Sequence, residues 1–543
     1  MAKVSVFWRI ARSLKSLVIN RENADSSKRI EFSQSMVDRR DRVKKAGIRQ
    51  VYYDYIMEDS GMTLEEIKDK VDRLRALDIT TLSLYKFMAN GIYKMDDEEA
   101  VATLYKMKES VELEDDLKWE YRLVDLGKKS FDDPVIKEKI ERFKALESGL
   151  LTDDAKMEIA MKAAYLHPEN MSKEEIDDLV MDMEFTRRII GYGHNGYSMF
   201  RLAEKTIPER REFISGKERL MLLPDINTAE SIAILDDKLL TYERLKDHFG
   251  RDMISIDSEK DYFRFKSFFE NNDAAVIKPR FDSLGKGIRL IHKSEIKNYR
   301  KYFLKLVDEY RRFLLEGFIE AADEIKALNP DSVNTVRIIA YFDGENTSIR
   351  SASMRIGHKG SFVDNAGAGG LTVAIDKKTG MIDSDGCDER GFRYERHPDT
   401  GIKFNGYQLP EWDKALAVVY DVSGRIEGAK YVGWDLALTK DHEWVIVEAN
   451  GKTGFFGAQA PHDNGRRREF LKTVGADPRG ALYNEVALKM AEEVKEEEGI
   501  PVEETMEKLR HFESLGLDGR YFKANRAWEL TDEQCLQIEE AKL

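Results

Sequence analysis

Three oxygen-bearing side chains, Asp435, Glu448 and Asn450, lie in two apolar segments that alternate like β-strands, YVGWDLAL and WVIVEAN. The polar stretch between the segments predicts a turn, and a turn centred on Asp441 and His442 places Asp435 directly opposite Glu448. Strand side chains two residues apart share a face, so Asn450 lies beside Glu448. Two facing carboxylates repel unless a cation lies between them, and hard oxygen ligands suit Mg²⁺. The alternative, a solvent-facing hairpin edge, is disfavoured because these acids interrupt apolar strands.

A lysine followed by a glycine-containing loop, AVIKP and then RFDSLGKG, forms a second candidate site. The apolar run predicts a strand that ends at Lys278. Glycines let backbone N–H groups approach a phosphate closely, while a lysine supplies a point charge. The loop is not a Walker A motif, and alone it fits an ordinary hairpin equally well. The phosphate-binding candidates here are Lys278, Ser283, Gly285 and Gly287.

Two further segments carry weaker signals. The stretch LLEGFIE, residues 314–320, predicts an apolar strand that ends in an acid and an aromatic, which suits an interdomain hinge, although alone it also reads as a plain strand end. The stretch 364–370 holds Asn365 among several glycines. We interpret it as a catalytic loop near a transferred phosphate rather than a flexible turn, because glycines cost conformational entropy without adding core.

Patterns along the chain indicate which elements position these residues. Residues 35–190 are charged, poor in proline and spaced as helices, whereas short apolar runs separated by Gly, Asp and Asn begin near residue 250. The pattern predicts an α+β fold without regular βαβ alternation. Expected strands are 274–277, 288–291, 313–316, 335–341, 348–356, 431–438 and 444–448, with helices near 295–311 and 411–427.

Helix starts and a weak internal similarity are visible in the charged regions. Thr63, Ser172 and Thr531 each precede acidic or amide groups, as N-caps do. The segments 64–99 and 503–534 resemble each other, with a looser echo over 135–175, which indicates either similar helical hairpins or chance likeness between charged helices.

In their order along the chain, ILDDKLL with Lys238, AVIKP, SLGKG, LLEGFIE and finally D…EAN resemble the ATP-grasp superfamily. The stretches NTVRI, MRIGHKGSFVDNAGAGGL, HPDTG and YVGWD resemble its sugar-transfer-associated branch and the related teichuronopeptide-synthesis-like proteins. The resemblance covers about residues 190–475. It implies the ATP-grasp fold, in which two α+β subdomains grip ATP between their sheets.

The resemblance also implies roles for single residues. Lys238 and Lys278 would bind the α- and β-phosphates beneath a lid at Ser283–Gly287. Asp435, Glu448 and Asn450 would bind one or two Mg²⁺, with Mn²⁺ as an alternative. Adenine would be held by Glu316 and the backbone of Gly317 and Phe318, and ribose by Glu320, Asp323 or Glu324.

The sequence departs from the family at Gly433, where many ATP-grasp ligases carry an arginine two residues before the first metal aspartate. Arg337 and Arg355 are the substitutes we expect, because a charged side chain in mid-strand needs a partner. A structural salt bridge is the alternative for both. The catalytic candidates are Arg337, Arg355, Lys286 and Asn365. The family's usual N-terminal α/β domain is not evident either.

Composition limits the function and the location. With 87 Lys and Arg against 101 Asp and Glu, the formal charge of -14 disfavours nucleic acid as a partner. Two cysteines and no long apolar run predict a cytoplasmic protein. Residues 3–18 interleave bases with apolar groups, which suits either a helix packed on the body, the favoured reading, or peripheral contact with the inner membrane surface.

We therefore expect a helical region at 1–189, an ATP-grasp core at 190–475 with a pre-grasp segment at 190–255, and a helical extension at 476–543. The expected reaction is ATP-dependent ligation of a carboxylate to an amine through an acylphosphate. The substrates would be small or glycan-linked, on a cell-surface polysaccharide or envelope precursor. A phosphotransferase and a non-catalytic, nucleotide-responsive scaffold are the alternatives. The acceptor, the donor and the oligomeric state do not follow from the sequence.

Overall fold

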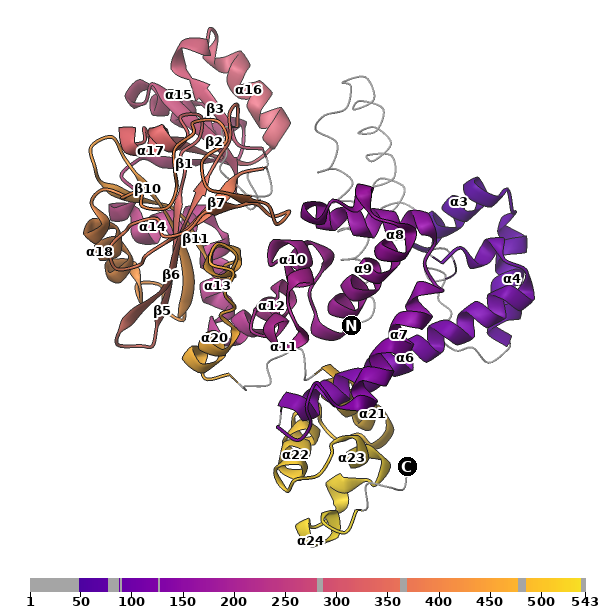
Figure 1. Cartoon of the computed structure of the whole chain (residues 1–543). Coiled ribbons are helices and arrows are strands. Elements are labelled where there is room, and N and C mark those ends of the chain that lie inside the picture. Colours follow the sequence, from indigo (N-terminus) through magenta and orange to yellow (C-terminus); the bar gives the residue numbers. More distant parts are fainter. Residues whose placement is uncertain are drawn as a thin grey trace. The chain divides into compact units, whose positions relative to one another are not determined.

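A computed structural model describes residues 48–76, 87, 90–125, 127–280, 287–361, 369–476 and 485–538. The chain divides into two compact units, Met1–Val111 and Glu112–Leu543 (Figure 1). The expected membrane-contacting helix at 3–18 lies outside the described residues. Among the described helices, none is long and apolar enough to cross a bilayer.

The first unit is built from helices whose apolar faces meet. Its elements are α3 (Ile48–Ser60), α4 (Leu64–Ala76), η1 (Ile92–Lys94) and the first half of α6 (Asp97–Asp125). Ile56, Ile67, Leu74 and Leu104 are buried together in its core. At the start of α4, the Thr63 hydroxyl accepts from the Glu66 amide, which confirms this helix start.

Helices also make up the described part of the second unit as far as residue 252. They are α7 (Pro134–Ser148), α8 (Asp153–Ala160), η2 (Met161–Leu166), η3 (Pro168–Asn170), α9 (Lys173–Phe185), η4 (Thr186–Ile190), α10 (His194–Met199), η5 (Leu202–Glu204), α11 (Ile207–Arg210), α12 (Gly216–Ile226), α13 (Ala229–Asp236), α14 (Lys238–Leu245) and η6 (Lys246–His248). The boundaries expected near 189 and 475 remain predictions.

One short turn recurs four times in the helical parts. Each copy has a residue with positive φ, a 3₁₀ turn, an extended residue and a capping residue bonded to an acid or amide three positions later. The positive-φ residues are Gly91, His167, Arg201 and Arg526. The capping pairs are Asp96 with Glu99, Ser172 with Glu175, Thr206 with Glu209 and Thr531 with Gln534. The internal similarity expected from the sequence therefore has a structural counterpart, and the copy at 201–209 adds a fourth.

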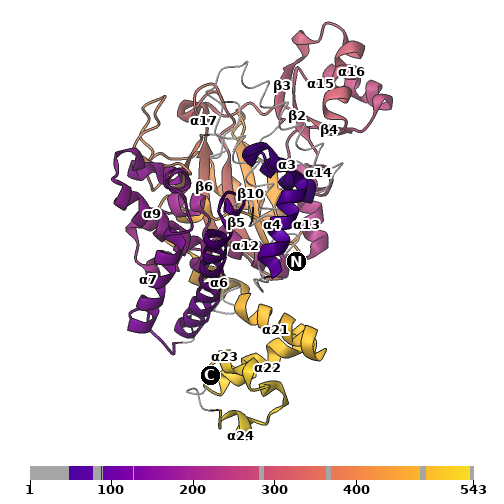
Figure 2. The same cartoon turned by 90° about the vertical axis from the view of Figure 1, so that its right-hand side faces the viewer.

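A four-stranded antiparallel sheet has the order β1-β4-β2-β3. Its strands are β1 (Met253–Ile256), β2 (Ala274–Pro279), β3 (Arg289–His292) and β4 (Phe313–Gly317). The helices α15 (Tyr262–Asn271) and α16 (Tyr299–Tyr310) bury Phe265, Phe269 and Phe303 against this sheet (Figures 1 and 2). The remaining short elements are η7 (Glu259–Asp261), η8 (Lys293–Glu295) and α17 (Asp323–Leu328).

A seven-stranded antiparallel sheet has the order β11-β10-β5-β6-β7-β8-β9. Its strands are β5 (Val336–Phe342), β6 (Thr347–Ile356), β7 (Leu371–Ile375), β8 (Gly386–Cys387), β9 (Arg393–Tyr394), β10 (Tyr431–Leu438) and β11 (Trp444–Asn450). The helix α18 (Trp412–Val422) packs with α14 into the main apolar core of this sheet. A separate cluster joins β5 and β10 to α12, α19 (Phe456–Gln459) and α20 (Arg467–Val474).

The C-terminal helices pack against the second half of α6, although the two segments are nearly 400 residues apart in the sequence. They are α21 (Glu485–Glu498), α22 (Val502–Ser514), α23 (Arg520–Ala524), η11 (Ala527–Glu529) and α24 (Asp532–Cys535). The Arg122 guanidinium donates to both oxygens of the Glu513 carboxylate at 2.6 and 2.7 Å, and both side chains are buried. A buried pair with two parallel hydrogen bonds fixes the register between α6 and α22.

Candidate functional site

The β10–β11 hairpin places Asp435 directly opposite Glu448, which confirms the predicted facing pair. The turn differs from the expected one, since Leu438 pairs with Trp444 and a five-residue loop joins the strands. A β-bulge after Asp435 absorbs the one-residue difference. Facing carboxylates are thus held by a strand pair whose other side chains are mostly buried.

Asp435 is fully buried and accepts four hydrogen bonds. Arg337 donates through Nε to Oδ1 and through Nη2 to Oδ2, both at 2.7 Å. Arg355 donates to Oδ2 at 2.9 Å, and the Asn450 amide donates to Oδ2 at 3.3 Å. Burial raises the pKa of Asp435, but the charges and hydrogen bonds of the two arginines outweigh burial and hold that pKa below its ordinary value. The carboxylate is therefore ionised at neutral pH.

Glu448 contrasts with Asp435. It is half-buried and has no hydrogen-bond or ion-pair partner among the described residues. Asn450 uses its amide nitrogen on Asp435, which leaves its amide oxygen for another partner. These oxygens fit a hard cation such as Mg²⁺. Asp435 already accepts three hydrogen bonds on Oδ2 and one on Oδ1, so it would join them through the remaining position on Oδ1 or after an arginine withdraws.

The surroundings of Gly433 leave no room for a side chain. A Cβ atom at Gly433 would lie 2.1 Å from Oγ1 of Thr453, so no larger residue fits there without displacing Thr453. The same point is 3.6 Å from Cδ of Arg337, which extends from the neighbouring strand β5. Arg337 thus reaches the space beside Gly433 from an adjacent strand.

A third arginine, Arg219 on α12, lies close enough to Arg337 to feel its charge. The sequence did not predict this position. Its Nη1 donates to the backbone carbonyls of Lys452 and of Thr453, the latter at 3.1 Å. Burial, and secondarily the charge of Arg337, lowers its pKa to about 10. No carboxylate partners Arg219 among the described residues, and the buried hydroxyl of Thr453 has no hydrogen bond in the structure. Two cations that repel each other beside an unused hydroxyl make a place suited to an oxyanion.

The four-stranded sheet holds a second buried carboxylate, Glu316. Its Oε2 accepts from Lys278 Nζ at 2.9 Å and from Nη2 and Nε of Arg251 at 2.9 and 3.2 Å. Burial raises the pKa of Glu316, and the charges of Lys278 and Arg251 more than offset that rise. The other oxygen, Oε1, is buried without a hydrogen-bond partner. An unpaired buried acceptor is costly, so this oxygen is suited to receive a donor from a ligand.

Some backbone hydrogen-bonding groups of the hinge after Glu316 already bond within the protein. The Gly317 amide donates to the carbonyl of Asp252 at 2.9 Å, which removes this N–H from the expected adenine contacts. The Lys440 amide donates to the carbonyl of Glu320, so the hinge pairs with the β10–β11 loop. The Phe318 side chain is exposed.

The three ribose candidates differ in their surroundings. The Glu320 carboxylate pairs with Lys440 at 2.8 Å and Lys326 at 3.3 Å, while Asp323 is fully exposed 3.9 Å from Lys326. Glu324 lies 3.6 Å from the His442 imidazole, and its Oε2 is buried without a hydrogen bond. Glu324 is therefore the candidate with an unused acceptor.

The remaining candidates lie at the edges of the described residues. Lys238 begins α14, where Asp237 caps the helix and pairs with Arg280 at 2.8 Å. Gly287 has φ of 71°, a left-handed conformation that favours glycine, on the return to β3. Ser283, Gly285, Lys286 and Asn365 lie outside the described residues.

The comparisons with known proteins agree with this geometry. Residues 218–476, just under half of the chain, match the family described as sugar-transfer associated ATP-grasp. This part of the chain is similar to that family, and its two antiparallel sheets with flanking helices agree with the α+β architecture of the ATP-grasp fold. A comparison with curated proteins gives no match.

Solved ATP-grasp structures resemble the chain distantly. D-alanyl-alanine synthetase A from Vibrio cholerae matches at 14% identity with a TM-score of 0.31, over 48% of this chain and 68% of the synthetase. N5-carboxyaminoimidazole synthetase from Staphylococcus aureus, complexed with ADP, matches at 12% identity with a TM-score of 0.29, over 49% of this chain and 59% of that one.

Proposed function

We propose that the protein is an ATP-dependent ligase that joins a carboxylate to an amine. Nucleotide would bind between the two sheets, with Lys278 and Glu316 on one side and Glu448 and Asn450 on the other. One observation carries the proposal: Glu448, which has no hydrogen-bond or ion-pair partner among the described residues, faces Asp435, and Asp435 in turn pairs with Arg337 on the next strand. Arg219, close enough to Arg337 to feel its charge, has no carboxylate partner among the described residues, so acceptors for a cation and donors for an oxyanion converge. That combination suits a metal-bound polyphosphate attacked by a carboxylate.

In the proposed reaction, a carboxylate oxygen of the acceptor attacks the γ-phosphorus of ATP. The bond from phosphorus to the bridging oxygen breaks, and ADP leaves with that electron pair. An amine then attacks the acyl carbon, the carbon–oxygen bond to phosphate breaks, and a proton of the amine is lost to solvent. Arg337 and Arg219 would hold the carboxylate and the transferred phosphoryl group, since preorganised donors stabilise charge that develops in the transition state.

The proposed Mg²⁺ site follows from the carboxylate and amide oxygens of the β10–β11 hairpin. Mg²⁺, when bound, would neutralise phosphate charge and orient the nucleotide. Glu448 and Asn450 would be its first protein ligands, and Asp435 would join them. When Arg337 turns from Asp435 towards a substrate oxyanion, it frees a carboxylate oxygen, so binding of the anion and binding of the cation support each other.

The substrate class belongs to the proposal as well. The family description associates the match with sugar transfer, which supports a carboxylate or amine carried on a cell-surface polysaccharide or envelope precursor. A cytoplasmic location is part of the proposal, because the sequence has only two cysteines.

The test is product analysis by mass spectrometry after incubation with Mg²⁺ and ATP and a panel of uronic acids, amino acids and amino sugars. We expect ADP, phosphate and an amide in equal amounts. A stable phosphorylated product without an amide would establish the phosphotransferase. Nucleotide binding without ADP formation over the whole panel would establish the scaffold.

A further inference from the structure

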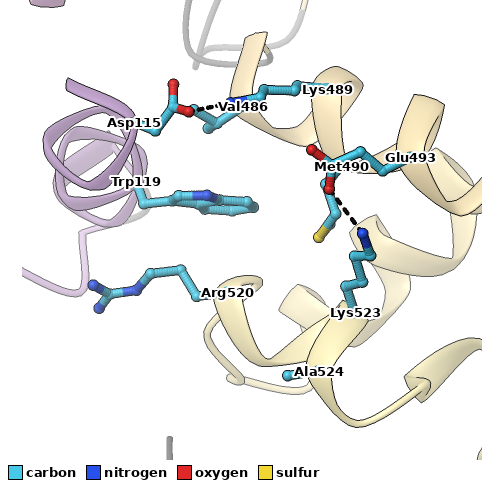
Figure 3. A pocket seen from close by; sticks show the side chains of 9 residues that line it. All are labelled: Asp115, Trp119, Val486, Lys489, Met490, Glu493, Arg520, Lys523 and Ala524. Atoms are coloured by element: carbon cyan, nitrogen blue, oxygen red, sulfur yellow. Dashed lines mark hydrogen bonds and ion pairs between the residues drawn. The ribbon is translucent and has the colours of Figure 1, made fainter. Parts of the chain in front are cut away.

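A cavity of about 490 Å³ lies between the second half of α6 and the C-terminal helices α21 and α23, outside the ATP-grasp region (Figure 3). Its size is within the ordinary range for small-molecule sites. The lining residues are Asp115, Trp119, Val486, Lys489, Met490, Glu493, Arg520, Lys523 and Ala524. The site contributes nothing to the nucleotide chemistry above, so it needs its own explanation.

An aromatic side chain dominates one wall. Trp119 extends from α6 into the cavity, between Asp115 and Arg520, towards Met490 (Figure 3). A Cβ atom at Gly519 would lie 2.9 Å from Cζ3 of the indole, so glycine at that position makes room for the ring. The ring is only partly buried and leaves apolar surface for a ligand.

The charged side chains of the wall already neutralise one another. Lys489 pairs with Asp115. Lys523 pairs with Glu493 at 2.8 Å. The Arg520 guanidinium lies 2.8 Å from Asp518, 2.9 Å from Glu120 and 3.0 Å from Asp116. An ionic ligand would have to break one of these pairs and leave a charge uncompensated. A neutral ligand would not.

The paired groups retain hydrogen-bonding capacity. A lysine ammonium has three donors and an ionised carboxylate about four acceptor positions, so Lys489 and Asp115 can each bond further groups without separating. A ligand for this wall should therefore be neutral, should both donate and accept, and should offer an apolar face to the indole. A pyranose ring meets all three conditions, because its hydroxyls donate and accept while its axial C–H groups form an apolar face.

We infer that the cavity is a binding site for an uncharged pyranose, and that it anchors the saccharide part of the protein's substrate. The anchoring role rests on the proposed function, whereas the binding of the sugar does not. A sugar-binding site on the helical extension gives residues 485–538 a role distinct from that of the ATP-grasp region.

Saturation-transfer NMR on the full chain without nucleotide tests the inference. The probes are the methyl glycosides of glucose, galactose and N-acetylglucosamine, with glucuronate as the charged counterpart. We expect at least one neutral glycoside to bind with millimolar affinity, more tightly than glucuronate. Because no ion pair forms, the affinity should not change with salt concentration.

Two variants place the binding in this cavity. Trp119→Ala should weaken the glycoside by about tenfold or more, which is about 1.4 kcal/mol. Ala524→Phe fills the cavity from an exposed position and should have the same effect without removing buried contacts. Tyr420→Ala, a half-exposed aromatic on α18, is the matched control and should leave binding unchanged.

Three results would overturn the inference: no binding of any neutral glycoside, binding that both cavity variants leave intact, or tighter binding of glucuronate that weakens with salt. Because nucleotide is absent, these results do not depend on the ligase reaction. A failed ligase assay with intact glycoside binding would refute the proposed function alone.

Discussion

The two sheets each hold a fully buried carboxylate against two cationic side chains, but they satisfy it differently. Asp435 in the seven-stranded sheet accepts four donors and has both oxygens occupied. Glu316 in the four-stranded sheet receives its three donors on one oxygen and keeps the other unpaired. The two sites thus have similar charges and different unused groups.

The difference in unused groups indicates which kind of ligand group each site suits. At Glu316 the unused group is an acceptor, which suits a neutral donor such as the amino group of adenine. At Asp435 the unused groups lie around the carboxylate, on Glu448 for a cation and on Arg219 for an anion. Under the proposed function, the four-stranded sheet would recognise the base and the seven-stranded sheet would bind the charged groups that react.

The largest loss of folding stability should come from substitution of Asp435. Asp435→Asn leaves Arg337 and Arg355, whose side chains are 20% and 18% exposed, without a countercharge. Removal of one partner of a buried ion pair costs about 3 to 5 kcal/mol, and the partial exposure of the arginines places the expected loss at the lower end of that range. We expect a comparable but smaller loss for Glu316→Gln, because Glu316 accepts three hydrogen bonds whereas Asp435 accepts four, the fourth from Asn450. Denaturant unfolding of both variants measures the difference. Equal stability of Asp435→Asn and the wild type would show that the arginine pairing is not structural.

Glu448 should behave in the opposite way. Glu448→Gln removes a carboxylate without a partner, so its free energy of unfolding should stay within about 0.5 kcal/mol of the wild type. Turnover should fall by roughly a hundredfold, the usual loss when a preorganised charged group is removed from an active site. Glu427→Gln, at an exposed position, is the control for ADP formation. A Glu448→Gln variant with normal turnover would refute the metal assignment.

Base recognition by Glu316 predicts a change in nucleotide selectivity. The unpaired Oε1 would accept from an adenine amino group and would repel the carbonyl of guanine, whereas a glutamine amide could donate to that carbonyl. Glu316→Gln should therefore reduce the preference for ATP over GTP by about tenfold, measured as a ratio of dissociation constants. An unchanged ratio would move adenine recognition elsewhere, to the backbone of Phe318.

Acid sensitivity compares the same two carboxylates. Both have pKa values lowered in the folded state, so their stabilisation is complete above the unfolded values of roughly 4 and is lost as the pH falls through the folded values. The stability of Asp435→Asn and Glu316→Gln should thus decline less steeply below about pH 4 than that of the wild type. Thermal unfolding between neutral pH and about pH 3 records this.

The smallest effect concerns Arg219. The pKa of Arg219 is lowered to about 10 in the folded state, so its charged form destabilises the fold at every pH below that value. This penalty is lost as the pH rises above about 10. Arg219→Gln should therefore raise the melting temperature slightly. It should also abolish the extra stability that pyrophosphate gives the wild type. If pyrophosphate stabilises both proteins equally, the oxyanion binds elsewhere.

Strands with strong alternation were predictable, and the reason is local. Tyr431–Leu438 has the predicted bounds, and the pair of Asp435 with Glu448 follows from the period of the strands. Short strands with no such signal, β1, β7, β8 and β9, were not predicted, because pairing with neighbours rather than their own composition makes them strands.

Contacts between side chains on distant elements could not be predicted from the sequence. Nothing in the pattern around Arg219 or Arg251 indicates that one faces Arg337 and the other Glu316. The position of Arg337 opposite Asp435 depends on the register between β5 and β10, which no local pattern in the sequence sets. The space filled by Thr453 beside Gly433 is likewise a product of tertiary packing.

Binding of Mn²⁺ in the presence of ATP, followed by electron paramagnetic resonance, tests the central assignment most directly, because it reports on the metal ligands without turnover. The account predicts that ATP tightens Mn²⁺ binding to the wild type and that Glu448→Gln weakens it by about tenfold or more. Equal Mn²⁺ affinity of the wild type and Glu448→Gln, with ATP bound to both, would contradict it.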